Sequence, residues 1–105
     1  MAFNRLDDGE AERLALLLEE LGEAQQAIGK ILRHGYESYN PDLSTDTERG
    51  PSNRMMLETE LGDVMAAMMI MEDAQDLNPL SISVRIGTKR KKVGKYLHHQ
   101  GPAIL

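Results

Sequence analysis

The pattern of apolar and polar positions along the chain predicts helices rather than strands. Leucine and alanine recur every three or four residues up to about Leu32, the period of a helix with one buried face. Asp7 or Asp8 can cap this first helix, and Glu10 is positioned to complete a capping box with Asp7. The periodicity fails over residues 34–53, which are rich in Gly, Pro, Asn, Asp and Ser. We therefore expect a long loop there.

Two more helices are expected after this loop. Ser52 can cap a second helix that extends to about Asp76. Asn78-Pro79 is a favourable start for a third, with Asn as the cap and Pro at the first helical position. Apolar residues alternate in this last segment as they do in a strand, but a single strand would have no partner. We therefore expect a basic third helix over 77–99.

The second helix indicates an assembly of several chains. Residues 64–71 read VMAAMMIM and contain no polar side chain. A helix that is apolar on all sides must be covered on all sides, which one hairpin partner and a short third helix cannot do. We expect an all-α fold, an antiparallel helical hairpin plus a third helix, that assembles into a homo-oligomeric four-helix-bundle-type core. The chain is one domain, 1–105, that ends in a tail at 100–105.

Charge and composition limit the possible partners. The chain has no cysteine, so disulfides and thiolate metal sites are excluded. No apolar run approaches the length of a membrane span, and Met1–Leu6 resembles no signal peptide, so we expect a cytoplasmic protein. The net charge is −11 over residues 1–76 and +6 over residues 77–105. The basic segment can neutralise the acidic body or bind phosphate.

Two pairs of acidic residues interrupt the apolar faces of the first two helices. Glu20 and Glu23 are three positions apart and share one helix face, as do Glu60 and Asp63. The apolar neighbours on these faces are Leu16, Ala27 and Ile31 in the first helix, and Met56, Ala67 and Met71 in the second. A single pair of this kind is usually a solvated helix face. Two pairs on two helices that pack antiparallel would converge in a partly buried site.

Four converging carboxylates require cations or shared protons. The donors are all oxygens, which select Mg²⁺, Mn²⁺ or Ca²⁺ over zinc or copper. Magnesium keeps positions open for substrate phosphates, so such a site suits a nucleotide polyphosphate. Gly22 and Gly29 on the first helix, and Gly62 on the second, can let the helices approach closely. The alternative is that these glycines are merely tolerated.

The two acidic motifs resemble those of a known enzyme family. Glu19-Glu20-Leu21-Gly22-Glu23 and Glu60-Leu61-Gly62-Asp63 are similar to the motifs of the all-α nucleotide pyrophosphohydrolases related to MazG. The resemblance covers roughly residues 10–76. It implies a homo-oligomer, dimer or tetramer, that hydrolyses nucleoside triphosphates to monophosphate and pyrophosphate with Mg²⁺. It also implies that the magnesium ligands are Glu20, Glu23, Glu60 and Asp63, with Glu19 as a ligand or a water-positioning group.

Two differences from the family bear on substrate binding. The segment between the two motifs is longer than in many members, and its residues Tyr36 and Tyr39 can line a base pocket or simply anchor the loop. Many relatives carry a Lys and an Asn on the following helix. This chain offers lysines there but no asparagine, so Lys89 and Lys92 are only suggested as phosphate contacts.

Two other functions stay open. One is a phosphoribosyl-ATP pyrophosphohydrolase, a related reaction for which the E-L-G-D motif is a poorer match. The other is a non-catalytic helical oligomer whose basic C-terminal segment binds nucleic acid. The overall acidity and the lack of a recognised nucleic-acid-binding motif argue against this second function.

Overall fold

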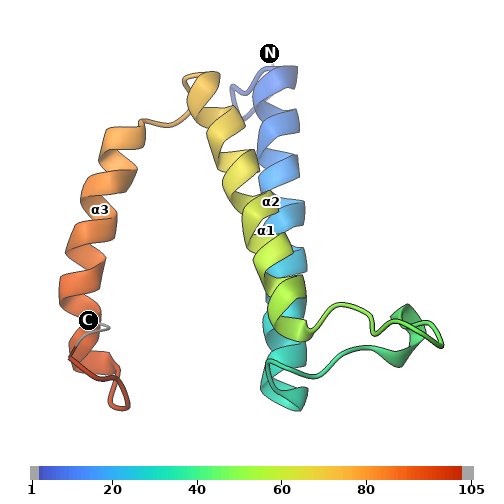
Figure 1. The fold of residues 1–105 in the computed structure, drawn as a ribbon. Helices are drawn as coiled ribbons and strands as arrows, with labels where there is room; N and C mark the ends of the chain where they lie inside the picture. Colours follow the sequence, from blue (N-terminus) through green and yellow to red (C-terminus); the bar gives the residue numbers. More distant parts are fainter. Residues whose placement is uncertain (1–2, 103–105) are drawn as a thin grey trace.

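Over the residues that the structure describes, the protein is all-α with three α-helices, as expected from the sequence. The computed structural model describes residues 3–102 (Figure 1). The elements are α1 (Asp8–His34), the 3₁₀ segment η1 (Pro41–Leu43), α2 (Asn53–Asp73), α3 (Pro79–Lys92) and the 3₁₀ segment η2 (Val93–Tyr96). Within the described residues the only β-type pairing is an isolated antiparallel bridge between Tyr39 and Ser52.

The helix starts lie where their capping residues predict them. The Asp7 side chain accepts a hydrogen bond from the Glu10 amide at 2.7 Å, and the Glu10 carboxylate accepts one from the Asp7 amide at 3.0 Å. Ser52 and Asn78 cap α2 and α3 with their side-chain oxygens alone, which accept hydrogen bonds from the Met55 amide and from the Leu80 and Ser81 amides. Each cap satisfies an amide that the first helical turn leaves without a partner.

The helix ends differ more from the prediction. Helix α2 ends at Asp73, three residues early, because the chain turns through a left-handed conformation at Gln75 (φ 67°). The basic segment is helical only over Pro79–Tyr96, as α3 followed by η2, rather than over 77–99. Of the expected tail at 100–105, residues 103–105 lie outside the described part of the chain.

Helices α1 and α2 pack as the expected antiparallel hairpin (Figure 1). Its buried side chains are mostly small: Ala24, Ala27, Val64, Ala67 and Met71. Alanines let the two backbones approach closely, and they occupy the apolar faces on which the acidic pairs lie. The glycines have no such role within the chain, since no atom lies within 4 Å of the position of a Cβ added at Gly22, Gly29 or Gly62. Of the two alternatives for these glycines, the contact between α1 and α2 therefore favours the one in which they are merely tolerated.

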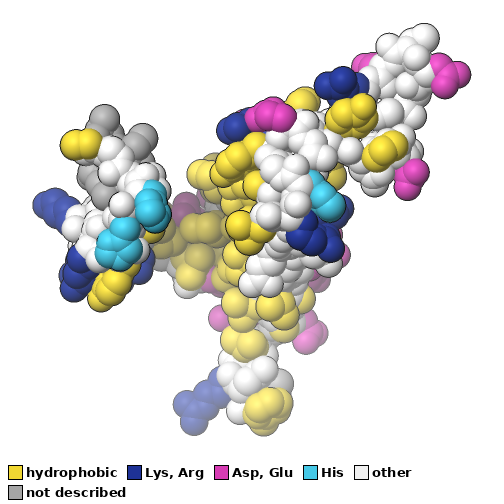
Figure 2. Space-filling model, turned by 90° about the horizontal axis from the view of Figure 1, so that it is seen from below, with side chains coloured by type: hydrophobic (Ala, Val, Ile, Leu, Met, Phe, Trp, Pro, Cys, Tyr) yellow, Lys and Arg dark blue, Asp and Glu magenta, His cyan; other side chains and the backbone are white. Residues whose placement is uncertain are grey.

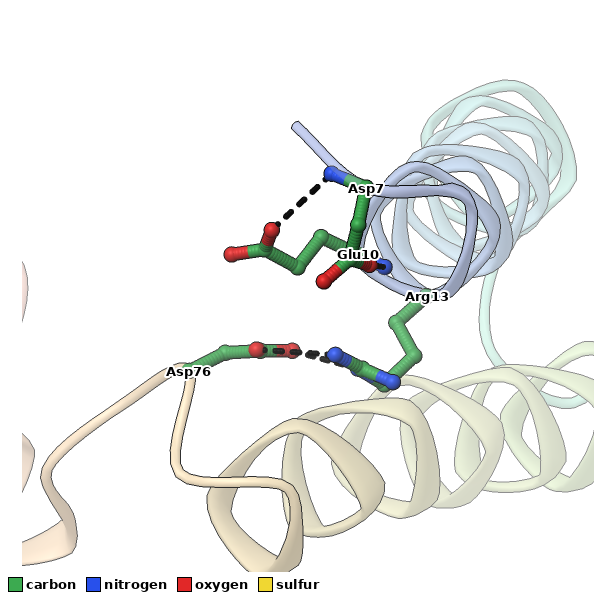
Figure 3. Close-up of polar contacts among 4 residues, drawn as sticks. All are labelled: Asp7, Glu10, Arg13 and Asp76. Carbon is green, nitrogen blue, oxygen red and sulfur yellow. Dashed lines mark hydrogen bonds and ion pairs between the residues drawn. The ribbon is translucent and has the colours of Figure 1, made fainter. Parts of the chain in front are cut away.

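A bidentate ion pair closes one end of the hairpin (Figure 3). The Arg13 guanidinium donates to the Asp76 carboxylate through Nε at 2.6 Å and through its NH2 nitrogen at 3.0 Å. These hydrogen bonds from Arg13 are the main cause that lowers the pKa of Asp76, and the charge of Arg13 adds to it. The pair joins the first turns of α1 to the turn that follows α2.

Helix α3 stands apart from the hairpin (Figure 1), so the chain is open and extended. The Cα radius of gyration is 17.8 Å, whereas a compact chain of this length has a radius of about 13 Å. Large apolar side chains remain exposed on both hairpin helices, among them Leu18 (73% exposed), Met65 (63%) and Met69 (58%). Figure 2 shows such side chains along the hairpin, with α3 and its basic side chains standing apart. Within residues 3–102 no helix is long and apolar enough to span a membrane.

Candidate metal centre

The hairpin brings together the four carboxylates that the sequence placed on two helix faces. One oxygen from each of Glu20, Glu23, Glu60 and Asp63 lies within 4.8 Å of the other three. We call these four residues the acidic cluster. In each of α1 and α2 the two acids are one helical turn apart and therefore share a face. The two helices pack antiparallel with these acids at the same level along the hairpin, so the two pairs face each other. The alanines of the core set the close spacing that the convergence requires.

Two carboxylate oxygens of the acidic cluster are buried without a partner. Oε2 of Glu20 and Oε2 of Glu60 are closed to solvent and have no hydrogen-bond partner within the described chain. A buried acceptor without a donor is costly, and most buried polar atoms in proteins are paired. A cation that contacts both oxygens would remove this cost.

Partial burial also changes the titration of these two acids. It is the main cause that raises the pKa of Glu20, and the carboxylates of Glu23 and Asp63 add to the effect. Partial burial is also the main cause that raises the pKa of Glu60, and the nearby Glu23 raises it further. Both shifts have the sign expected for negative charges that are crowded and partly removed from water. A divalent cation would reverse both effects.

Beside the acidic cluster is a cavity of about 240 Å³. Its walls include Glu23 and Glu60 of the cluster, together with Gln26, Ala27, Lys30, Asn53 and Met56. The positive charge of Lys30 is close enough to Glu60 to oppose the rise in its pKa. The cavity walls therefore hold both carboxylates and an ammonium group, a combination that suits an anion bound through a metal ion.

Sequence reasoning missed Lys30 and Asn53, although a signal for both was present. Lys30 lies seven residues after Glu23, and Asn53 lies seven residues before Glu60. Seven residues are almost two full turns, so each residue shares a face with its acid. In an antiparallel hairpin these two offsets lead toward the same end, where both residues line the cavity.

The other predicted site residues lie elsewhere. Glu19 is exposed on α1 and is not among the four residues whose oxygens converge. Lys89 and Lys92 are on α3, and neither of them lines the cavity beside the cluster. Within one chain these two lysines are not positioned to contact a phosphate bound at the acidic cluster.

The connection between α1 and α2 is the long loop expected from the sequence, and its two ends are joined. The Asn53 amide donates to the Ser38 carbonyl at 2.7 Å, and the Arg54 amide donates to the Tyr36 carbonyl at 2.8 Å. The buried Asn53 side chain donates to the Gly35 carbonyl at 3.1 Å. Gly35 has φ 86°, a conformation that favours glycine and that turns the chain out of α1.

Comparisons with known proteins supply no family for this chain. No protein-family model matches the sequence, and neither a curated protein nor a solved structure matches it. The structure itself shows an all-α molecule whose hairpin carries a cluster of four carboxylates that could hold a metal ion.

Proposed function

We propose that the protein is a MazG-like nucleoside triphosphate pyrophosphohydrolase of the cytoplasm, which converts nucleoside triphosphates to nucleoside monophosphate and pyrophosphate with Mg²⁺. The observation that carries the proposal is the convergence of Glu20, Glu23, Glu60 and Asp63 from two helices, with two of their oxygens buried and without partners. An acidic surface patch without a ligand would be solvated, whereas this cluster is partly withdrawn from water.

The acidic cluster fits a hard divalent cation. All of its donors are carboxylate oxygens, the ligands that Mg²⁺ and Mn²⁺ prefer. Glu20, Glu23, Glu60 and Asp63 would hold the metal, which supplies charge neutralisation at the phosphates and activation of water when bound. The two unpartnered oxygens of Glu20 and Glu60 provide acceptor positions that no protein donor occupies.

The residues of the chain then position the reaction and move its proton. Water attacks the α-phosphorus, the bond between this phosphorus and the bridging oxygen breaks, and pyrophosphate leaves. The proton of the attacking water passes to a carboxylate of the acidic cluster.

The test is pyrophosphate release from a panel of ribo- and deoxyribonucleoside triphosphates, with Mg²⁺, with Mn²⁺ and with EDTA. We expect release that depends on the metal and that Glu60→Gln and Asp63→Asn abolish without a change in the helical circular dichroism signal. Glu58→Gln is the matched control, because Glu58 is exposed on the same helix and lies outside the cluster. Glu19→Gln decides whether this residue takes part.

Three other results would contradict the proposal in different ways. Full metal-dependent activity in both cluster variants would remove the assigned site. Turnover of phosphoribosyl-ATP alone would assign the related reaction. No turnover of any nucleotide, combined with strongly salt-dependent DNA binding, would favour a nucleic-acid-binding oligomer that acts through the basic residues of α3.

We propose further that the active form is a homo-oligomer. Apolar side chains that are exposed in the single chain recur on α1 at Leu14, Leu18, Leu21, Ile28 and Leu32. With Gln25 these positions alternate in steps of four and three residues, the spacing of a helix seam that packs against another helix. A second copy offers the same stripe and covers it by symmetry.

A further inference from the structure

A second, larger cavity adjoins the one beside the acidic cluster. This second space measures about 460 Å³ and lies between the end of α1 and the loop 35–52. The two cavities share Lys30, Asn53 and Met56 in their walls. They therefore lie side by side, with Glu23 and Glu60 lining the first cavity and the loop lining the second. We call the larger cavity the loop cleft.

The two cavities differ in chemistry. The cavity beside the acidic cluster is lined mainly by charged and amide groups. The loop cleft has a wall of apolar and aromatic side chains, supplied by Tyr39, Pro41, Leu43, Pro51 and Met56. Polar side chains line it as well: Arg33 and His34 from the last turn of α1, Ser38 and Asn40 from the loop, and the shared Lys30 and Asn53. A ligand that occupies both cavities would have an anionic end beside the metal site and, in the loop cleft, an end that combines apolar surface with hydrogen-bonding groups, which describes a nucleotide.

We propose that the loop cleft is the nucleoside-binding subsite and that Lys30 binds the phosphate next to the nucleoside, at the junction of the two cavities. The inference rests on the proposed function, because that function supplies the polyphosphate at the acidic cluster. It gives the substrate a direction along α1, with pyrophosphate on the cluster side and the base under the loop.

Lys30 has the reach that this position requires. It lies seven residues after Glu23, about 10 Å along the helix axis. Side chains of a helix lean toward its N-terminus, so the long lysine side chain extends back toward the acidic cluster. Lys30 is exposed and lines both cavities. Its ammonium group can therefore meet a phosphate that sits between the metal site and the cleft.

Tyr39 is the aromatic group positioned to contact a base. It is half-buried, and its backbone is fixed by the bridge to Ser52. The Arg49 guanidinium lies 4.4 Å from the centre of its ring, which holds the ring in place. Tyr36 is engaged differently: its ring lies 4.2 Å from the Arg54 guanidinium, and it does not line the loop cleft. Of the two loop tyrosines, only Tyr39 is therefore assigned to the subsite.

The experiment compares two ligands that differ by the nucleoside. One is a set of α,β-methylene deoxynucleoside triphosphates, which cannot be cleaved at the expected bond. The other is inorganic tripolyphosphate. Binding of each to the full chain is measured by calorimetry in Mg²⁺, for the wild type, Lys30→Gln, Tyr39→Ala and Tyr39→Phe. Lys92→Gln and Tyr36→Ala are the matched controls.

Lys30→Gln should weaken both ligands by roughly tenfold or more, the loss expected for a hydrogen bond to a charged group. Tyr39→Ala should weaken the tightest nucleotide analogue by roughly tenfold, the usual effect of removing a stacking ring, and should leave tripolyphosphate unchanged. Tyr39→Phe keeps the ring and should bind as the wild type does. Both control variants should also bind as the wild type does.

The outcomes separate this inference from the proposed function. If the wild type releases pyrophosphate while Lys30→Gln and Tyr39→Ala bind both ligands normally, the function stands and the subsite is overturned. An equal loss of both ligands in Tyr39→Ala, or a loss in Lys92→Gln in place of Lys30→Gln, also overturns it. The expected binding pattern without pyrophosphate release supports the subsite and removes the hydrolase. No binding of either ligand to the wild type removes both.

Discussion

Replacement of Met65 by glutamate should dissociate the proposed homo-oligomer. Met65 is 63% exposed in the single chain, so a carboxylate at this position would be solvated if nothing covered it. In an assembly that covers α2, the same carboxylate would be removed from water. If the substitution lowers the mass of the particle in solution, the cause is therefore a lost contact between chains and not a change in the fold of one chain.

The size of the effect follows from the accessible surface. One chain exposes 8648 Å², whereas a compact monomer of 11.7 kDa exposes about 5,900 Å². The excess exposed surface is about 2,700 Å² per chain. If two chains cover this excess against each other, they bury about 5,400 Å² in total, which is at the upper end of the range for obligate interfaces. A buried carboxylate costs several kcal/mol, and about 3 kcal/mol already weakens association more than 100-fold.

The assay is sedimentation velocity at several protein concentrations, with circular dichroism on the same samples. The wild type should sediment as a multiple of 11.7 kDa, and Met65→Glu should shift toward the monomer with a partial loss of helix. Thr47→Glu adds the same charge at an exposed position of the loop, and it should not change the mass. A wild type that sediments as a fully helical monomer would refute the surface argument, whatever the variants do.

Four further predictions concern one chain. Mg²⁺ at ten times its dissociation constant should raise the free energy of unfolding of the wild type by about 1.4 kcal/mol, which corresponds to roughly 6–11 °C in Tm. In the same thermal melt, Mg²⁺ should leave the Tm of Glu60→Gln unchanged. In EDTA at pH 7 this variant should be at least as stable as the wild type, because burial penalises the charged form of Glu60; a lower Tm would contradict this. The pKa of Asp76 is lowered from 3.8 by Arg13, so the ion pair stabilises the fold above this pH and the gain is lost as pH falls through the folded pKa. Urea unfolding should accordingly separate Asp76→Asn from the wild type at pH 7 and not at strongly acidic pH, and a gap that persists in acid would exclude the ion pair as its cause. Asn53→Ala leaves the Gly35 carbonyl without its donor and should cost about 1–3 kcal/mol in the same assay; a change below about 0.5 kcal/mol would show that this hydrogen bond contributes little.

The local signals in the sequence were sufficient for the helices and for the acidic cluster. The capping box of Asp7 and Glu10, and the caps at Ser52 and Asn78, depend on neighbours within three residues. The convergence of the acids depends on a spacing of three residues within each helix and on the antiparallel hairpin. Such features follow from helical geometry alone, so a single sequence is enough to predict them.

Features that depend on three-dimensional packing were not predictable in the same way. Glycine permits a close approach but does not require it, and alanines such as Ala67 line the hairpin contact instead. The family resemblance suggests phosphate contacts from Lys89 and Lys92, yet only the path of the chain after Asp76 decides where these two residues lie. The sequence offers Tyr36 and Tyr39 as candidates for a base pocket, but only the fold decides that Tyr39 lines the loop cleft and Tyr36 does not, because the hydrogen bonds that shape the loop join its two ends.

The exposed methionines of α2 have a consequence for how an assembly of this chain would respond to its surroundings. A methionine side chain is flexible and polarisable, so Met65 and Met69 can adapt to a facing helix without one fixed register. The same thioethers are open to oxidants in the separated chain, and a sulfoxide there is polar. Oxidation would thus act first on separated chains and would hinder their return to the assembly, which makes the redox history of the protein a determinant of its subunit equilibrium.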